Sequence, residues 1–131
     1  MVGCTAYIQR RVTVSNDRKV EYSKYGSRQP VVVFMSGLGN TMDTRRDVYW
    51  SVSKVSTAVM VNRMGYGRSS KTDNPRTADQ IVSELREFLA AAGYQLPCLL
   101  VGHSAGGLYA VYYTKTSPGV VGGMVLVDAS H

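Results

Sequence analysis

Short apolar runs, each bounded by polar or glycine-rich segments, recur along the chain. Four of them occupy residues 30–35, 57–61, 97–101 and 120–127. Continuous apolar runs of this length are typical of strands that are buried on both faces, as in a parallel sheet. The pattern therefore predicts a sheet whose central strands are parallel, with helices in the intervening segments.

The N-terminal part of the chain has a different pattern. In residues 7–14 and 19–25 apolar and polar positions alternate, and the two segments are separated by Ser15-Asn16-Asp17, a turn signal. Alternation of this kind predicts two antiparallel strands at an edge of the sheet.

The clearest helix lies between residues 77 and 93. Thr77-Ala78-Asp79-Gln80 has the form of a capping box, and Gly93 is a typical helix terminator. One apolar stripe runs between them, made of Ile81, Val82, Leu85, Phe88 and Leu89.

Two further helices are predicted. Residues 43–56 carry Val48, Val52 and Val55 at helical spacing, and Tyr49 and Trp50 broaden this apolar face, so we expect the tryptophan in the core. A second helix is expected from residue 108 to the residues before Pro118.

The most informative motif is Gly102-His103-Ser104-Ala105-Gly106, which connects a predicted strand to a predicted helix. In this setting Gly-x-Ser-x-Gly predicts a nucleophile elbow, a sharp turn that holds the Ser104 hydroxyl clear of the backbone. Ala105 would donate its amide to an oxyanion at the helix N-terminus. The alternative is a glycine-rich turn whose serine takes no part in chemistry, and His103, next to the serine, is interpreted as structural or pocket-lining.

Two other loops follow predicted strands. Residues 36–40 supply backbone amides, and Leu38, or its neighbours Gly37 and Gly39, is the candidate for a second oxyanion donor. Residues 62–70 contain Gly65-Tyr66-Gly67 without the third glycine of a dinucleotide fingerprint. Arg63 and Arg68 flank this loop, either as solvated side chains or as partners of a substrate carboxylate.

The loop at residues 36–39, the loop at residues 63–69, the elbow and the segment 125–128 resemble the α/β-hydrolase family in order and spacing. The resemblance implies an α/β fold with a mostly parallel sheet and helices on both faces, forming a single partial domain over residues 1–131 that is truncated after strand six. It also implies Ser104 as nucleophile, with the amides of Leu38 and Ala105 as oxyanion donors. The chain departs from the family at Ser36, where His is more common, and at Asn62, where Asp is usual.

The family's catalytic order is serine, acid, histidine. After Ser104 the chain offers one acid, Asp128, and one histidine, His131. Two interpretations are open. Either Asp128 and His131 form a compact triad with Ser104, or Asp128 belongs to an ordinary strand end and the catalytic base comes from elsewhere. The resemblance thus implies a serine hydrolase acting on a carboxylic ester or related acyl bond of a small molecule, and the alternative is a catalytically incomplete fragment or a non-catalytic binding module. No metal or organic cofactor is implied.

Composition narrows the class of protein. With 44% hydrophobic and 18% charged residues, the 131-residue chain is typical of a globular domain. The net charge of +6 comes from scattered Lys and Arg, which argues against nucleic-acid binding. The two cysteines, Cys4 and Cys98, have no metal or disulfide-framework spacing, and no apolar segment approaches the length of a membrane span. We therefore expect a cytoplasmic protein without stable membrane insertion.

The last predicted strand is apolar throughout and has no predicted neighbour on its outer side. An open apolar edge invites pairing with another strand. We expect this edge to form a homodimer or to bind a complementing C-terminal half.

Overall fold

The computed structural model describes residues 8–35, 46–94 and 96–127. Within this part of the chain, six strands form one sheet. The strands are β1 (Ile8–Thr13), β2 (Lys19–Tyr25), β3 (Val31–Met35), β4 (Thr57–Val61), β5 (Cys98–His103) and β6 (Val121–Val127). All six lie close to the predicted positions, and the turn between β1 and β2 is a short 3-10 helix, Ser15–Asp17.

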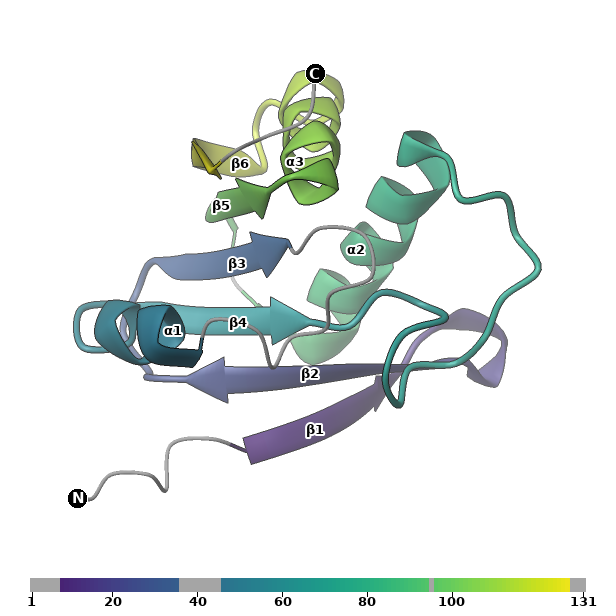
Figure 1. The fold of residues 1–131 in the computed structure, drawn as a ribbon, viewed down its shortest axis with the longest axis horizontal. Helices are drawn as coiled ribbons and strands as arrows, with labels where there is room; N and C mark the ends of the chain where they lie inside the picture. Colours follow the sequence, from purple (N-terminus) through teal and green to yellow (C-terminus); the bar gives the residue numbers. More distant parts are fainter. Residues whose placement is uncertain (1–7, 36–45, 95, 128–131) are drawn as a thin grey trace.

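The sheet has the strand order β1-β2-β4-β3-β5-β6. The pairs β4–β3, β3–β5 and β5–β6 are parallel, whereas β1 and β2 join antiparallel at one edge. The chain moves from β3 to β4 on one side and then crosses to β5 on the other side of β3 (Figure 1). The carboxyl ends of β3 and β5 therefore flank the point where the strand order reverses, which is where open α/β sheets bind ligands.

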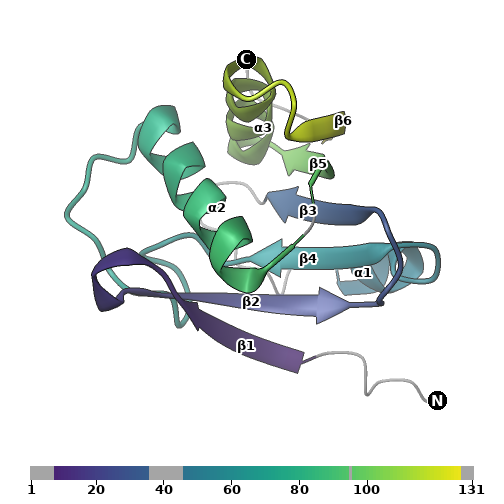
Figure 2. The same cartoon turned by 180° about the vertical axis from the view of Figure 1, so that it is seen from behind.

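In the described part of the chain, three α-helices cover the two faces of the sheet. They are α1 (Arg46–Val52), α2 (Ala78–Ala92) and α3 (Ala105–Thr116). Figures 1 and 2 show α1 on one face and α2 with α3 on the opposite face. Each face has its own apolar core, the larger one beneath α2 and α3. None of the helices in the described ranges combines the length and the apolar character that a membrane crossing needs.

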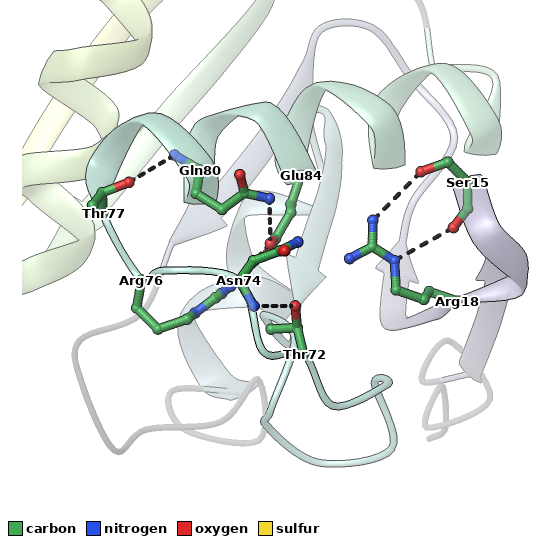
Figure 3. Close-up of polar contacts among 8 residues, drawn as sticks. All are labelled: Ser15, Arg18, Thr72, Asn74, Arg76, Thr77, Gln80 and Glu84. Atoms are coloured by element: carbon green, nitrogen blue, oxygen red, sulfur yellow. Dashed lines mark hydrogen bonds and ion pairs between the residues drawn. The ribbon is translucent and has the colours of Figure 1, made fainter.

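The ends of α2 follow from its sequence. The Thr77 hydroxyl accepts a hydrogen bond from the Gln80 amide at 3.2 Å, and Gly93 ends the helix in the left-handed conformation, at φ 77°. The Gln80 side chain does not complete the predicted capping box but donates to Glu84 at 3.0 Å. Glu84 is also held by both terminal nitrogens of Arg76, at 2.9 and 3.1 Å (Figure 3). This carboxylate is buried on the face that the apolar stripe predicts, with its charge paired.

Helix α1 corrects one prediction. Trp50 is not a core residue, because 41% of its surface is exposed and its ring only borders Tyr25, edge to face. Tyr49 anchors the helix instead, at 3% exposure. The helix ends at Val52, so Val55 lies beyond it and is 69% exposed. The apolar face of α1 is therefore centred on Tyr49 and not on the valines.

Candidate active site

The turn at Ser104 has the geometry of a nucleophile elbow. Strand β5 ends at His103 and helix α3 begins at Ala105, so Ser104 alone forms the connection. Its backbone lies at φ 56° and ψ −122°, a conformation that residues with a side chain rarely adopt. The position and backbone conformation of Ser104 fit the motif, which predicts a strained serine between a strand and a helix.

Gly102 is required for this turn by close packing. A Cβ at residue 102 would lie 2.5 Å from the Cα of Gly107 and 2.7 Å from the carbonyl oxygen of Gly106. Both contacts are with the backbone of α3, which cannot move aside as a flexible side chain would. The glycine thus lets the first turn of α3 approach the end of β5.

The first turn of α3 offers amide donors beside Ser104. Gly107 donates to the Ser104 carbonyl at 3.0 Å, which closes the first turn of the helix. Ala105 is the first helical residue, and the first amides of a helix have no acceptor within it. The positive end of the helix dipole adds to this donor site, so the turn can stabilise negative charge that develops next to the serine.

Strand pairing shows which segments adjoin the elbow. Met35, the last residue of β3, pairs with Gly102, and Val127, the last residue of β6, pairs with His103. The loop that contains Leu38 follows Met35 in the sequence, and Asp128 and His131 follow Val127. The predicted donor Leu38 and the predicted acid and base, Asp128 and His131, themselves lie outside the described residues.

The loop after β4 places an arginine next to the elbow helix. The Arg63 guanidinium carbon lies 5.1 Å from the ring centre of Tyr66 and 5.4 Å from that of Tyr109, which belongs to α3. The structure thus gives Arg63 the role of a stacked cation, one that the sequence does not indicate. Arg68, the second arginine considered, is exposed, and its amide donates to Glu21.

Glu21 is a buried residue that the sequence analysis missed. Its Oε1 accepts from the Asn62 side chain at 2.8 Å and from the Arg68 amide at 2.7 Å. Gly67 has a positive φ of 52°, and a Cβ there would lie 2.3 Å from Nδ2 of Asn62 and 2.7 Å from Oε1 of Glu21, so glycine favours this close approach of the loop to the carboxyl group. The only signal for this burial in the sequence is that Glu21 is an acidic residue in the alternating segment of β2 and that the loop which covers it is rich in glycine.

A small cavity lies between α2 and the sheet. Its volume is about 30 Å³, and the residues that line it include Met35, Arg63, Met64 and Leu85. This is room for about two water molecules. Substrate pockets measure on the order of 300 Å³ or more. The described residues therefore do not enclose a substrate pocket here.

Cys98 does not compete with Ser104 as a nucleophile. It lies in β5, fully buried and not in a disulfide, and burial raises the pKa of its thiol. A buried protonated thiol is unreactive. Among the described residues, no group of three or more His, Cys, Asp or Glu side chains could hold a metal ion.

Known proteins with similar sequences and folds include several hydrolases. The chain is 30% identical to an esterase of Mycobacterium tuberculosis over 112 residues, which are 82% of this chain and 35% of the esterase. A crystal structure of a membrane phospholipase A matches 95% of the chain with a TM-score of 0.89 and 24% identity, and the chain covers 40% of it. Epoxide hydrolase VrEH1 of Vigna radiata matches with a TM-score of 0.84 and 22% identity, over 95% of this chain and 40% of that structure.

These matches confirm the fold that the strand pattern and motifs predict. The chain spans less than half the length of these relatives. A family model described as serine aminopeptidase, S33, matches residues 26–130, a range that includes β3 to β6, all three helices and the elbow. With four-fifths of its length matched by that model, the chain belongs to the α/β-hydrolase family.

Proposed function

We propose that this chain carries the nucleophile of a serine hydrolase that cleaves a carboxylic ester or a related acyl bond. The observation that carries the proposal is the backbone of Ser104, which is strained between β5 and α3 at the carboxyl ends of the parallel strands, where open α/β sheets bind ligands. Backbone strain of this kind costs about 1–3 kcal/mol and clusters at active sites. The esterase and phospholipase named among the similar proteins support an ester as the substrate class.

The proposed reaction proceeds through an acyl-enzyme. A base removes the proton of the Ser104 hydroxyl while Oγ forms a bond to the substrate carbonyl carbon. The carbonyl oxygen becomes an oxyanion that accepts hydrogen bonds from the amides of Ala105 and Leu38. The leaving alkoxide takes the proton from the base and departs as an alcohol, which leaves the acyl-enzyme. Water, activated by the same base, then attacks the acyl-enzyme, releases the carboxylic acid and restores the serine.

His131, oriented by Asp128, is the base that the chain itself offers in this proposal. The experiment that tests the proposal is intact-mass analysis of the purified, folded chain after exposure to a fluorophosphonate. We expect one adduct, which Ser104→Ala abolishes and which Ser51→Ala, at an exposed serine of α1, leaves unchanged. His131→Gln should then slow adduct formation by a factor of about 100 or more.

The opposite result is equally informative. A chain that is folded by circular dichroism and forms no adduct would overturn the proposal for this chain, and would favour a fragment or binding module without a base. An adduct that persists in Ser104→Ala would exclude Ser104 as the reactive group.

The two edges of the sheet support a further part of the proposal. Strand β1 carries Arg10 and Arg11, charges of the kind that discourage pairing at an edge. Strand β6 carries no charge, and its residues Met124 to Val127 are exposed, with Val125 at 58%. We propose that a complementing C-terminal segment adds strands at this edge, and the greater length of the similar proteins supports this choice.

Light scattering on the purified chain distinguishes the two occupants considered for this edge. If the chain is a monomer and Val125→Lys lowers its tendency to aggregate, the result supports an edge that binds a complementing segment. A stable dimer that Val125→Lys dissociates would overturn that choice in favour of a second copy of the chain.

A further inference from the structure

We propose that Arg63 is a positioning residue for the elbow, acting through Tyr109 of helix α3. The inference rests on the proposed function, because it concerns how the Ser104 hydroxyl and the Ala105 amide are held in place. It adds a residue outside the motif, from the loop after β4.

The contact itself is a cation close to two aromatic rings. The guanidinium carbon of Arg63 lies within 5.1 Å of the Tyr66 ring centre and 5.4 Å of the Tyr109 ring centre. Both distances are within the range of cation–π attraction. The planar guanidinium stacks on rings in a way that an ammonium group does not, so lysine is a poor substitute.

Tyr109 is the first large buried side chain of α3. Gly106 and Gly107 have no side chain, and Leu108 is 44% exposed. Tyr109 is 6% exposed and lies four residues, or about one turn, after Ala105. Tyr109 is therefore the one large side chain that packs the N-terminal half of the helix on the rest of the fold, beside the small Ala105 and Ala110 and the backbone contact at Gly102.

The loop that presents Arg63 is anchored independently of α3. Glu21 binds the Asn62 side chain and the Arg68 amide, on either side of Arg63 and Tyr66. Further along the loop, Ser70 exchanges hydrogen bonds with Lys19 of β2, each at 2.8 Å. Because the loop is bound to β2, the stacked arginine fixes α3 to the antiparallel edge of the sheet and does not move with the helix.

The C-terminal half of α3 has a separate attachment of the same type. Arg86 of α2 lies 5.3 Å from the ring centre of Tyr113 and donates to the hydroxyls of Ser117 and Thr116. This contact provides a control for position, because the same substitution at residue 86 removes a cation–π contact, together with these hydrogen bonds, from the other end of the same helix.

Amide hydrogen exchange tests the inference without requiring Ser104 to be reactive. In Arg63→Met we expect the Gly107 amide, bonded to the Ser104 carbonyl, to exchange about five-fold faster, while the amide of Phe88 in α2 is unchanged. Arg86→Met should leave Gly107 unchanged and accelerate exchange at Ser117, whose amide bonds to the Tyr113 carbonyl.

A second pair of variants separates positioning from general stability. Tyr109→Phe keeps the ring and should preserve protection at Gly107, whereas Tyr109→Leu should reproduce the effect of Arg63→Met. Arg63→Lys should restore little of the protection. Uniform acceleration at all amides, or unchanged exchange at Gly107 in both Arg63→Met and Tyr109→Leu, would overturn the inference.

The two proposals fail separately in this design. Loss of protection at Gly107 without any fluorophosphonate adduct in the wild type would keep the positioning role and reject the serine-hydrolase activity of this chain. Where the wild type does form the adduct, Arg63→Met should slow its formation by about the same five-fold factor, and Arg86→Met should not.

Discussion

The backbone amide of Ser104 donates a hydrogen bond to the carbonyl oxygen of Val127 at 3.2 Å. This bond joins the elbow directly to the last described residue of β6, which pairs with His103 in the sheet. The position of the candidate nucleophile therefore depends on β6 as well as on β5 and α3. A shift in the register of β6 would be transmitted to Ser104 through one hydrogen bond.

Gly102→Ala tests the close packing of β5 on α3. The new Cβ would lie 2.5 Å from the Gly107 Cα, and relief requires movement of the helix backbone. We expect the free energy of unfolding to fall by about 2 kcal/mol. Urea denaturation measures this, and Gly119→Ala is the control, because a Cβ there meets nothing within 4 Å and should change stability by less than about 0.5 kcal/mol. Equal effects at the two glycines would contradict the packing argument.

Features that depend on residues close together in the chain could be predicted from the sequence. Helix α2 was predicted with its cap at Thr77, its terminator at Gly93 and its buried stripe, because those signals are local. The turn at Ser104 was predicted for the same reason, since strand, glycines and helix are contiguous in the chain.

Residues whose environment comes from distant segments were not predicted. Trp50 is exposed because α1 packs on the sheet through Tyr49, and neighbouring side chains in one helix do not reveal which of them faces the core. Glu21 is buried because a loop 41 residues later in the chain closes over it. Arg63 stacks on Tyr109 only once β4 and β5 lie in the same sheet.

Glu21→Ala should destabilise the fold strongly. The substitution leaves the Asn62 side chain and the Arg68 amide without their acceptor. Buried unsatisfied donors cost about 1–3 kcal/mol, so we expect a loss of about 2 kcal/mol in the free energy of unfolding. Glu21→Gln should lose less, because its amide oxygen can replace Oε1 as acceptor for both donors.

A matched acid on the surface provides the control for Glu21. Glu87 contacts Ser15 in an exposed hydrogen bond. Chemical denaturation of Glu87→Ala should show a change of less than about 0.5 kcal/mol. A loss at Glu87 as large as that at Glu21 would mean that burial of the carboxyl group is not the reason for its effect.

Two tyrosines make the fold sensitive to alkaline pH. Burial raises the pKa of Tyr113 to about 12, with a smaller contribution from Cys98. Burial also raises the pKa of Tyr94 to about 12, with a smaller contribution from Tyr22. The folded state favours the neutral phenol, so this stabilisation is fully present below about pH 10, the pKa in the unfolded chain, and is lost as the pH rises to about 12.

Urea denaturation at several alkaline pH values, with tyrosinate absorbance as the readout of ionisation, tests this prediction. We expect the free energy of unfolding to fall across this window, and to fall less steeply in Tyr113→Phe and Tyr94→Phe. A curve of the same slope in both variants would show that other groups cause the alkaline loss.

Ser104→Gly should make the fold more stable than Ser104→Ala. At φ 56° and ψ −122° serine and alanine bear the same backbone strain, whereas glycine adopts this conformation without it. Relief of about 2 kcal/mol of backbone strain outweighs the conformational entropy that glycine gains in the unfolded chain. In urea denaturation we therefore expect the free energy of unfolding of Ser104→Gly to exceed that of Ser104→Ala by about 1 kcal/mol. At Ser117, where φ is −141°, the same pair of substitutions should give the opposite order. If alanine were at least as stable as glycine at residue 104, the backbone would store no strain there, and the elbow would lose the feature on which the proposed function depends.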